Sequence, residues 1–145
     1  MYIPLLKSHS GLRWILLILF VSALVMLFRA AYQGKYSKKL ALTAKMTLIL
    51  THIQFLLGLV LYFISPKVIF AASSMKVSVF RFYLVEHISL MLIAVILLTI
   101  GFSKSKNLLH TQAGAKKMFT YYIISFILIM ISIPWPFRNF GAGWF

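Results

Sequence analysis

Three histidines lie in or beside apolar segments of this sequence, where ionisable side chains are rare. They are His9, His52 and His87; the fourth histidine, His110, falls in the polar segment SKSKNLLHTQAGAKK. An imidazole at membrane depth is costly and usually functional, because lipid offers it no hydrogen-bond partner. Imidazole nitrogens are also axial ligands of haem iron. The first three histidines are therefore candidates for chemistry, whereas His110 is expected to be a solvated loop residue.

A single carboxylate accompanies these histidines. Glu86 is the only acidic residue, against 15 Lys plus Arg, and it directly precedes His87 in the segment YLVEHISLML. Because an unpaired charge is strongly disfavoured in lipid, we expect an ion pair between Arg13 and Glu86, with Arg81 as the alternative partner. Two other interpretations stay open: Glu86 accepts a hydrogen bond from another histidine ring, or it only fixes helix register. Catalysis by paired carboxylates is excluded within this chain.

The composition indicates that these groups lie in a membrane. Of 145 residues, 62% are hydrophobic and only 11% are charged, whereas soluble domains have about 45–50% apolar and about 25% charged residues. The net charge of +14 would suit nucleic acid, but most basic residues stand between apolar segments, as in polytopic membrane proteins. We therefore expect a lipid bilayer and no nucleic acid as partner. Cysteine is absent, which excludes thiolate metal sites and covalently attached c-type haem.

Four apolar segments are long enough, at about 20 residues, to cross a bilayer. Their approximate ranges are residues 3–31, 42–64, 80–102 and 117–133. The last segment should end before Pro134 and Pro136, which cannot continue a helix. Short connections favour neighbouring antiparallel helices. We therefore predict one domain over residues 1–145, an all-α integral membrane four-helix bundle with up-down-up-down topology, in which the longer segment 65–79 lies on the membrane surface or caps the bundle.

The basic residues predict the orientation of this bundle. Nine of them are assigned to the loops after the first and third spans and six to the other side, so both termini should lie outside the cytoplasm. The nine are Arg29, Lys35, Lys38, Lys39, Lys45, Lys104, Lys106, Lys116 and Lys117.

Helix geometry brings two of the histidines to the same depth. The first and third spans run in the same direction and are diagonal in a simple bundle, and both His9 and His87 lie roughly 10 Å below the outer edge. Two level imidazoles across a bundle core suit an axially ligated haem. His52, roughly 18 Å deep, could serve a second haem, bond a neighbouring helix or line a proton or quinol path. Arg13, Lys76 or Arg81 could neutralise haem propionates at the outer rim.

The residues that share a face with each histidine support this arrangement. Steps of three and four from His87 reach Met91, Ala94, Leu98 and Gly101, and those from His9 reach Arg13, Leu16, Phe20, Ala23 and Leu27. Small residues on both faces allow helices or a cofactor to approach closely. The two faces are therefore predicted to point into the bundle.

Four segments of the chain resemble a family of small bacterial four-helix membrane proteins labelled cytochrome b-like. They are HSG at 9–11, HIQFLLGLVLYF at 52–63, VEHISLMLIAVILLTIGFSKSK at 85–106 and SIPWPF at 132–137. The chain also resembles, more distantly, one half of haem A synthase, but it contains neither that enzyme's E-x-x-H-R arrangement nor its duplication. The resemblance implies a bacterial inner-membrane location and haem b, one or two per chain. It implies His9 and His87 as axial ligands, with Glu86 and His52 as buried polar helpers.

Two functions follow as hypotheses. The first is a b-type cytochrome that passes electrons between a membrane quinol and partner redox subunits, since two imidazole ligands saturate the iron. The second is a haem-free accessory or assembly subunit of a larger respiratory membrane complex, in which the histidines serve helix packing. A small transporter is a third interpretation, disfavoured because no broken helices or inverted repeats are evident. Sequence motifs of soluble hydrolases and nucleotide-binding enzymes are absent.

Overall fold

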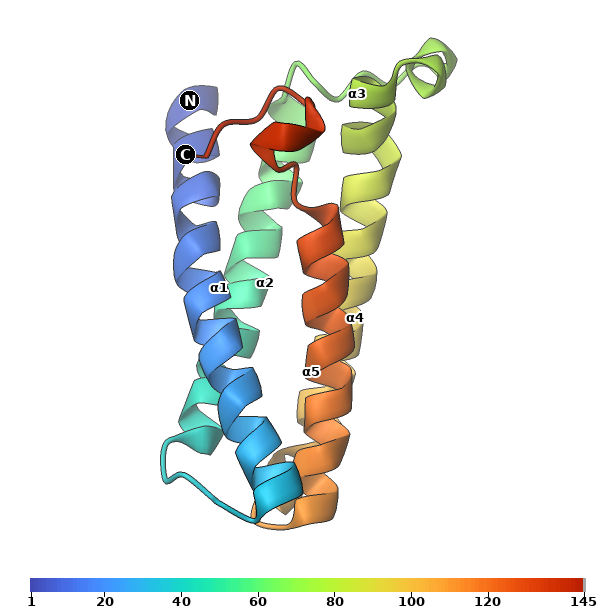
Figure 1. The fold of residues 1–145 in the computed structure, drawn as a ribbon. Helices are drawn as coiled ribbons and strands as arrows, with labels where there is room; N and C mark the ends of the chain where they lie inside the picture. The colour runs from blue at the N-terminus through green and yellow to red at the C-terminus, as the bar shows by residue number, and fades with distance from the viewer. Residues whose placement is uncertain (145) are drawn as a thin grey trace.

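Four long helical rods stand side by side in the computed structural model, which describes residues 1–144, and both ends of the chain lie at one end of the bundle (Figure 1). The rods are α1 (Tyr2–Gln33), α2 (Leu40–Ile64), a composite of α3 (Ser78–Arg81), η2 (Phe82–Glu86) and α4 (His87–Ser105), and α5 (Gln112–Ser132). Short 3-10 turns are η1 (Ala72–Lys76), η3 (Lys106–Leu108) and η4 (Pro136–Arg138). Each rod is long and apolar enough to cross a membrane. The prediction of an all-α four-helix membrane bundle is confirmed.

Local sequence signals set where the helices begin and end. Gly34 ends α1 in the left-handed conformation, with φ of 65°, which glycine adopts without strain. Thr111 begins α5 because its hydroxyl accepts the backbone N–H of Gly114 at 3.1 Å. The predicted start of this span at residue 117 was therefore too late. Lys116 and Lys117 lie in the first turns of α5, not in the preceding loop.

The packing order of the helices matches the predicted topology. Helix α1 packs against α2 and α5, and α4 packs against the same two helices from the other side. Helices α1 and α4 are therefore diagonal partners. As predicted, the faces below the two histidines point inward: Leu16, Phe20, Ala23 and Leu27 of α1 are buried, as are Ala94, Leu98 and Gly101 of α4.

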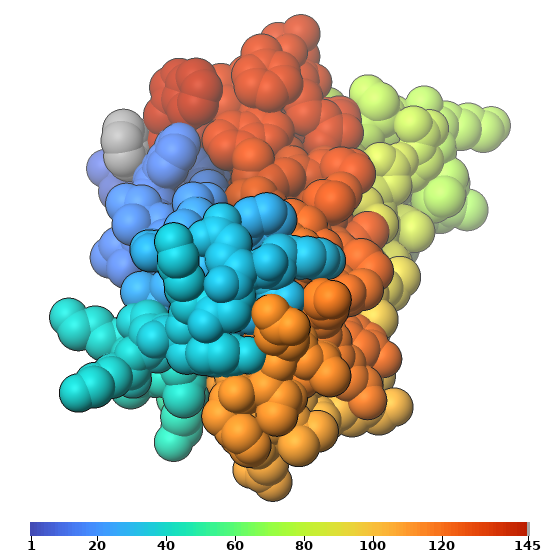
Figure 2. Space-filling view, turned by 60° about the horizontal axis from the view of Figure 1, so that its bottom comes forward, coloured from blue at the N-terminus to red at the C-terminus, as the bar shows by residue number. Residues whose placement is uncertain are grey.

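The half of the bundle away from the termini is filled by side chains. The Phe20 and Tyr122 rings lie 5.7 Å apart, and the Tyr122 hydroxyl donates to the Ala44 carbonyl at 2.8 Å. At the end itself, Phe119 packs against Phe28 and Tyr32, with 5.9 Å between ring centres in each pair. Figure 2 shows this end, where the last turns of α1 and the start of α5 form a closed surface. Any large internal space must therefore lie nearer the termini.

The outer surface of the bundle is apolar on every rod. Large exposed apolar side chains recur at helical spacing, so they form stripes facing away from the core. Examples are Ile18, Val21 and Val25 on α1, Leu56, Val60 and Phe63 on α2, Leu92, Ile93 and Ile96 on α4, and Ile124, Ile127 and Ile131 on α5. Such a surface is stable in contact with lipid. The chain is a multi-pass membrane protein.

Gly101 allows α4 and α5 to approach closely, which gives a testable prediction. A Cβ at this position would lie 2.3 Å from Cβ of Tyr121, an atom fixed to the backbone. We expect Gly101→Ala to lower the free energy of unfolding by about 1–3 kcal/mol, because the two helices must move apart. Thermal unfolding in detergent measures this loss. Gly11→Ala is the matched control, since nothing lies within 4 Å of its added Cβ.

Candidate functional site

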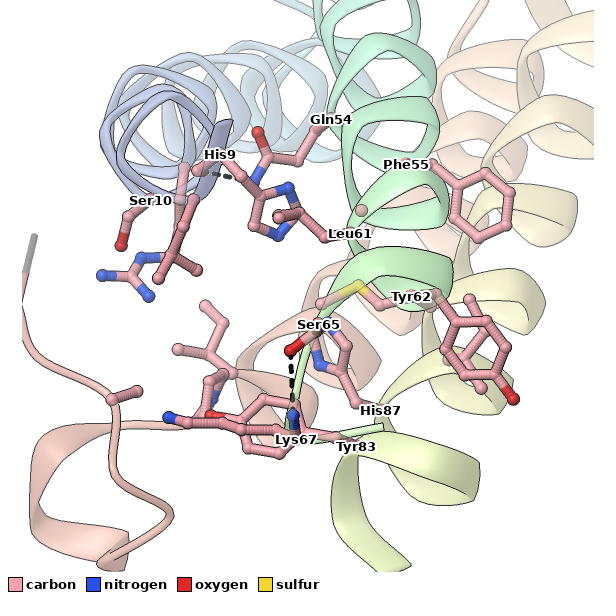
Figure 3. A pocket seen from close by; sticks show the side chains of 18 of the residues that line it. His9, Ser10, Gln54, Phe55, Leu61, Tyr62, Ser65, Lys67, Tyr83 and His87 are labelled. Atoms are coloured by element: carbon pink, nitrogen blue, oxygen red, sulfur yellow. Dashed lines mark hydrogen bonds between the residues drawn. The ribbon is translucent and has the colours of Figure 1, made fainter. Parts of the chain in front are cut away.

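A cavity of about 180 Å³ lies between the helices toward the end that carries both termini. Figure 3 shows that His9 and His87 extend into this one space from different helices. Most of the lining is apolar, including Leu16, Leu17, Phe55, Ile88, Met91, Val95, Ile129 and Ile133. The polar or charged lining residues are Tyr2, His9, Ser10, Arg13, Thr51, Gln54, Tyr62, Ser65, Lys67, Tyr83 and His87. Of the predicted site residues, the cavity therefore brings together His9, His87 and Arg13.

His87 is held with one ring nitrogen available. Its Nδ1 lies 2.8 Å from the Ser132 carbonyl oxygen, which can only accept, so Nδ1 carries the proton. The Ser132 hydroxyl in turn donates to the His87 carbonyl at 3.2 Å. In the described part of the chain, Nε2 of His87 makes no hydrogen bond and keeps its lone pair. A histidine fixed through Nδ1–H in this way has the orientation that metal-ligating histidines use.

A π-helical turn directly precedes His87 and distinguishes this rod from the others. The turn covers Phe82–Glu86, and the His87 N–H bonds to the Phe82 carbonyl, five residues back. The Tyr62 hydroxyl of α2 donates to the Leu84 carbonyl within this turn at 3.0 Å. Single π-turns inside α-helices occur frequently at functional sites. The turn and its contact with α2 together set the rotation at which His87 enters the cavity.

His9 occupies a space that Gly58 leaves open on α2. A Cβ at Gly58 would lie 3.0 Å from Cε1 of His9 and 3.6 Å from its Nδ1. The Gln54 side-chain amide donates to the His9 carbonyl at 2.8 Å and so ties α1 to α2 at this level. His9 Nδ1 is buried and has no partner among residues 1–144, and the same holds for Gln54 Oε1. Unsatisfied buried polar atoms carry a free-energy cost, so these two atoms can accept hydrogen bonds from a water molecule or a ligand in the cavity.

His52 lies outside the cavity and both of its ring nitrogens are bonded. Nδ1 lies 2.8 Å from the Leu48 carbonyl in its own helix, so it carries the proton, and Nε2 lies 3.2 Å from the Thr99 hydroxyl of α4. Of the three roles predicted for His52, the structure favours the bond to a neighbouring helix. The role in a second haem stays a prediction, and the cavity lined by His9 and His87 does not include His52. His110 is exposed near the start of α5, as predicted for a solvated residue.

Two cations stand at the mouth of the cavity. Arg13 Nη2 donates to the Trp144 carbonyl at 2.7 Å, and the guanidinium lies 5.4 Å from the Trp14 ring centre. Lys67 Nζ donates to the Phe140 carbonyl at 3.4 Å and also to the Gly141 carbonyl. Burial lowers the pKa of Lys67, because a charged amine is less well solvated there. Of the rim cations proposed for haem propionates, Arg13 lines the cavity, whereas Lys76 and Arg81 do not.

The expected ion pair between Arg13 and Glu86 is wrong. Glu86 pairs instead with Arg81, its alternative partner, with 2.8 Å between Oε1 and Nε. Residues five apart point about 140° away from each other in a regular α-helix. The π-turn, with its five-residue hydrogen bond, brings them to one face. Glu86 is therefore on the rim of the bundle and does not line the cavity.

Because the ion pair between Arg81 and Glu86 is partly exposed, its removal should change the free energy of unfolding only slightly. The side chains of Arg81 and Glu86 are 43% and 39% exposed, and pairs of this kind contribute about 0–1 kcal/mol. Glu86→Gln should therefore lower the free energy of unfolding by less than about 1 kcal/mol, measured by thermal unfolding in detergent. A loss of several kcal/mol would contradict the placement of Glu86 at the rim.

Several site residues were not identified from the sequence. Gln54 and Gly58 belong to the segment HIQFLLGLVLYF, which was predicted to be helical. Nothing in that segment indicated that these two residues contact His9. Lys67 and Tyr83 were not singled out as site residues. Lys67 follows the predicted second span, and Tyr83 lies near the start of the predicted third span. Ser132 is a small residue at the end of α5, and only the fold shows that its carbonyl meets His87.

Comparison with known proteins finds no matching family model, no matching curated protein and no matching solved structure. The resemblance to cytochrome b-like proteins and to haem A synthase therefore remains a prediction from the sequence. Functional inference rests on the geometry of the cavity.

Proposed function

We propose that this chain is a b-type haem-binding membrane protein that passes electrons between a membrane quinol and partner redox subunits. His9 and His87 are the proposed axial ligands. The observation that carries this proposal is the state of His87. Its Nδ1 proton is held by the Ser132 carbonyl, its Nε2 makes no hydrogen bond within the described residues, and its side chain lines the same cavity as His9. Two imidazoles on diagonal helices form the donor set of a six-coordinate haem.

The donor set and the largely apolar lining support haem as the cofactor. Within the described residues, no cluster of three or more His, Cys, Asp or Glu side chains could hold a metal ion by itself. A porphyrin needs only the two axial donors that His9 and His87 offer, because its own nitrogens occupy the other positions. The His9 ring fills the space that Gly58 leaves, and its buried Nδ1 has no partner within residues 1–144; both observations support a role for this ring in binding a ligand.

The residues around the histidines would tune such a site. Apolar side chains of three helices, Ile88, Met91, Val95, Ile129 and Leu16, exclude water from the deep part of the cavity. The Ser132 carbonyl fixes the tautomer of His87 and raises its basicity as a ligand. Bound haem would supply a one-electron redox centre, with both axial positions filled by imidazole.

An optical spectrum of the purified protein tests the proposal. We expect a b-type absorption band that shifts on reduction with dithionite, together with close to one haem per chain by pyridine extraction. A preparation from haem-sufficient cells that contains folded protein and no band would overturn the proposal.

The alternative function is that of a haem-free accessory or assembly subunit of a respiratory membrane complex. One observation favours it: the cavity volume of about 180 Å³ is below the about 300–1,000 Å³ of typical ligand pockets. In that case His9 and His87 would serve packing, and the protein would copurify with membrane partners without a chromophore. The same spectrum separates the two functions.

We also propose that the cavity end faces away from the cytoplasm of a bacterial inner membrane. Nine basic residues gather at or near the helix ends opposite the cavity, and cytoplasmic segments carry such an excess. Because the chain has no cysteine, a single Ser37→Cys or Ser73→Cys substitution allows the test. In intact cells, an impermeant maleimide should label the Ser73→Cys variant and leave the Ser37→Cys variant unlabelled.

A further inference from the structure

The mouth of the cavity is covered by residues 139–144, here named the C-terminal strap. Gly141, Ala142 and Gly143 of the strap line the cavity. Lys67 Nζ donates to the carbonyls of Phe140 and Gly141, and the Tyr83 hydroxyl donates to the Phe140 carbonyl at 3.2 Å. These contacts attach the first part of the strap to two residues that also line the cavity.

The last described residue of the strap is held in the same way. Arg13 Nη2 and Trp14 Nε1 both donate to the Trp144 carbonyl, at 2.7 and 3.0 Å. The strap is thus attached at two points, and a cation donates at each of them. All of the acceptors at these points are backbone carbonyls.

The two cations lack a side-chain counter-charge. The only acidic side chain of the protein, Glu86, is paired with Arg81 and does not line the cavity. Hydrogen bonds from a cation to an ionised acceptor are roughly twice as strong as those between neutral groups. In addition, Arg13 Nε is buried without a partner within residues 1–144. An anionic group would therefore form stronger hydrogen bonds with these two cations than the strap carbonyls do.

We propose that Arg13 and Lys67 form an anion subsite at the mouth of the cavity, which the strap carbonyls fill until the carboxylates of an amphiphilic ligand displace them. The proposal deepens the proposed haem-binding function and rests on it, because haem has an apolar ring that suits the lining and two propionates that suit the cations. Lys67 is thereby a binding residue that the sequence did not indicate.

The strap is built so that only part of it needs to move. Phe140 stacks on Phe82 with 4.1 Å between ring centres and 12° between planes, and the Arg138 guanidinium lies 4.8 Å from the Phe140 ring centre. These contacts anchor the start of the strap. Gly141 follows, with φ of +67°, a conformation that glycine adopts without strain. Rotation at Gly141 would carry residues 142–144 away from the cavity and turn the Gly141 carbonyl away from Lys67. The anchor would stay in place, and with it only the longer contact of Lys67 with the Phe140 carbonyl at 3.4 Å.

Displacement of the strap would also enlarge the cavity. With the strap in place the volume is about 180 Å³, less than the about 300 Å³ at which typical ligand pockets begin. Because strap residues form part of the wall, their removal enlarges the space at the mouth, where the propionates would lie.

Two porphyrins and two lysine variants test the subsite. Haem-free protein in nanodiscs of neutral lipid is titrated with iron protoporphyrin and with its dimethyl ester, which has no carboxylate charge. We expect the ester to bind about tenfold more weakly than the free acid, a difference of about 1.4 kcal/mol. Lys67→Met should weaken binding of the free acid by a similar factor and hardly change the ester. Lys7→Met is the matched control, since Lys7 has the same charge at the same end but does not line the cavity.

The possible outcomes distinguish a failure of the anion subsite from a failure of haem binding itself. Equal binding of acid and ester by the unaltered protein overturns the subsite while leaving haem binding intact. Failure of both porphyrins to bind overturns the proposed function and the subsite with it. A single Ala142→Cys substitution reports on the strap: its labelling by maleimide should become several-fold faster with saturating haem, and an unchanged rate overturns displacement.

Discussion

His87→Asn should abolish the b-type absorption band while leaving the fold of the protein intact. The side-chain amide of asparagine can replace Nδ1–H as donor to the Ser132 carbonyl, which His87 contacts at 2.8 Å. It has no counterpart to Nε2, so the proposed iron ligand is lost and the structural hydrogen bond is kept. We expect haem affinity to fall by at least about a hundredfold, or roughly 2.7 kcal/mol. Haem content per folded chain measures the loss.

Two further variants test whether the loss of the band is due to the loss of an iron ligand at His87. His52→Ala should keep the band, because both ring nitrogens of His52 are bonded outside the cavity. His87→Met should keep some bound haem and raise its reduction potential, since a thioether is an axial ligand that favours reduced iron. If His87→Asn retained the full band, His87 would not be a ligand and the proposed site would be wrong.

The membrane bundle and its inward faces could be predicted from the sequence. Apolar length alone identifies the four rods, and helical periodicity places Leu16, Phe20 and Ala23 on one buried face. The same periodicity brought His9 and His87 toward a common space, because α1 and α4 are diagonal and run in the same direction. These properties depend on regular geometry, which a sequence specifies well.

The departures from regular geometry could not be predicted. The π-turn at Phe82–Glu86 changes which side chains share a face, so Glu86 meets Arg81 instead of a residue on another helix. Regular spacing of 100° per residue disfavours that pair, so the sequence offered Arg81 only as the alternative to Arg13. Contacts of Lys67 with the strap depend on a loop and a terminal segment, whose paths follow from tertiary packing and not from periodicity.

The two ends of the bundle differ in how their interior is filled, and this difference creates the site. Away from the termini, small residues such as Gly101 bring helices together and aromatic rings fill the remaining core. Toward the termini, the space beside Gly58 is filled by the imidazole ring of His9 and not by the close approach of another helix. Small residues therefore tighten one end and make room for an imidazole at the other.

Gly58→Ala should stabilise helix α2 and at the same time lower the affinity of the site for haem. Alanine is favoured over glycine in a helix interior by about 1 kcal/mol, so unfolding should not become easier. The new Cβ would lie 3.0 Å from Cε1 of His9, closer than such atoms pack, so the imidazole must shift. Because axial ligation requires a defined ring position, we expect haem affinity to fall about tenfold, or about 1.4 kcal/mol, and further in Gly58→Val.

Gly11→Ala separates this effect from a general one. It makes the same substitution in a neighbouring helix, and nothing lies within 4 Å of its added Cβ. Thermal unfolding and haem titration of the two variants should therefore agree in stability and differ in affinity. Equal affinity in both would show that the His9 ring can move without cost, and His9 would then be no ligand, since a ligand bound to iron cannot change position freely.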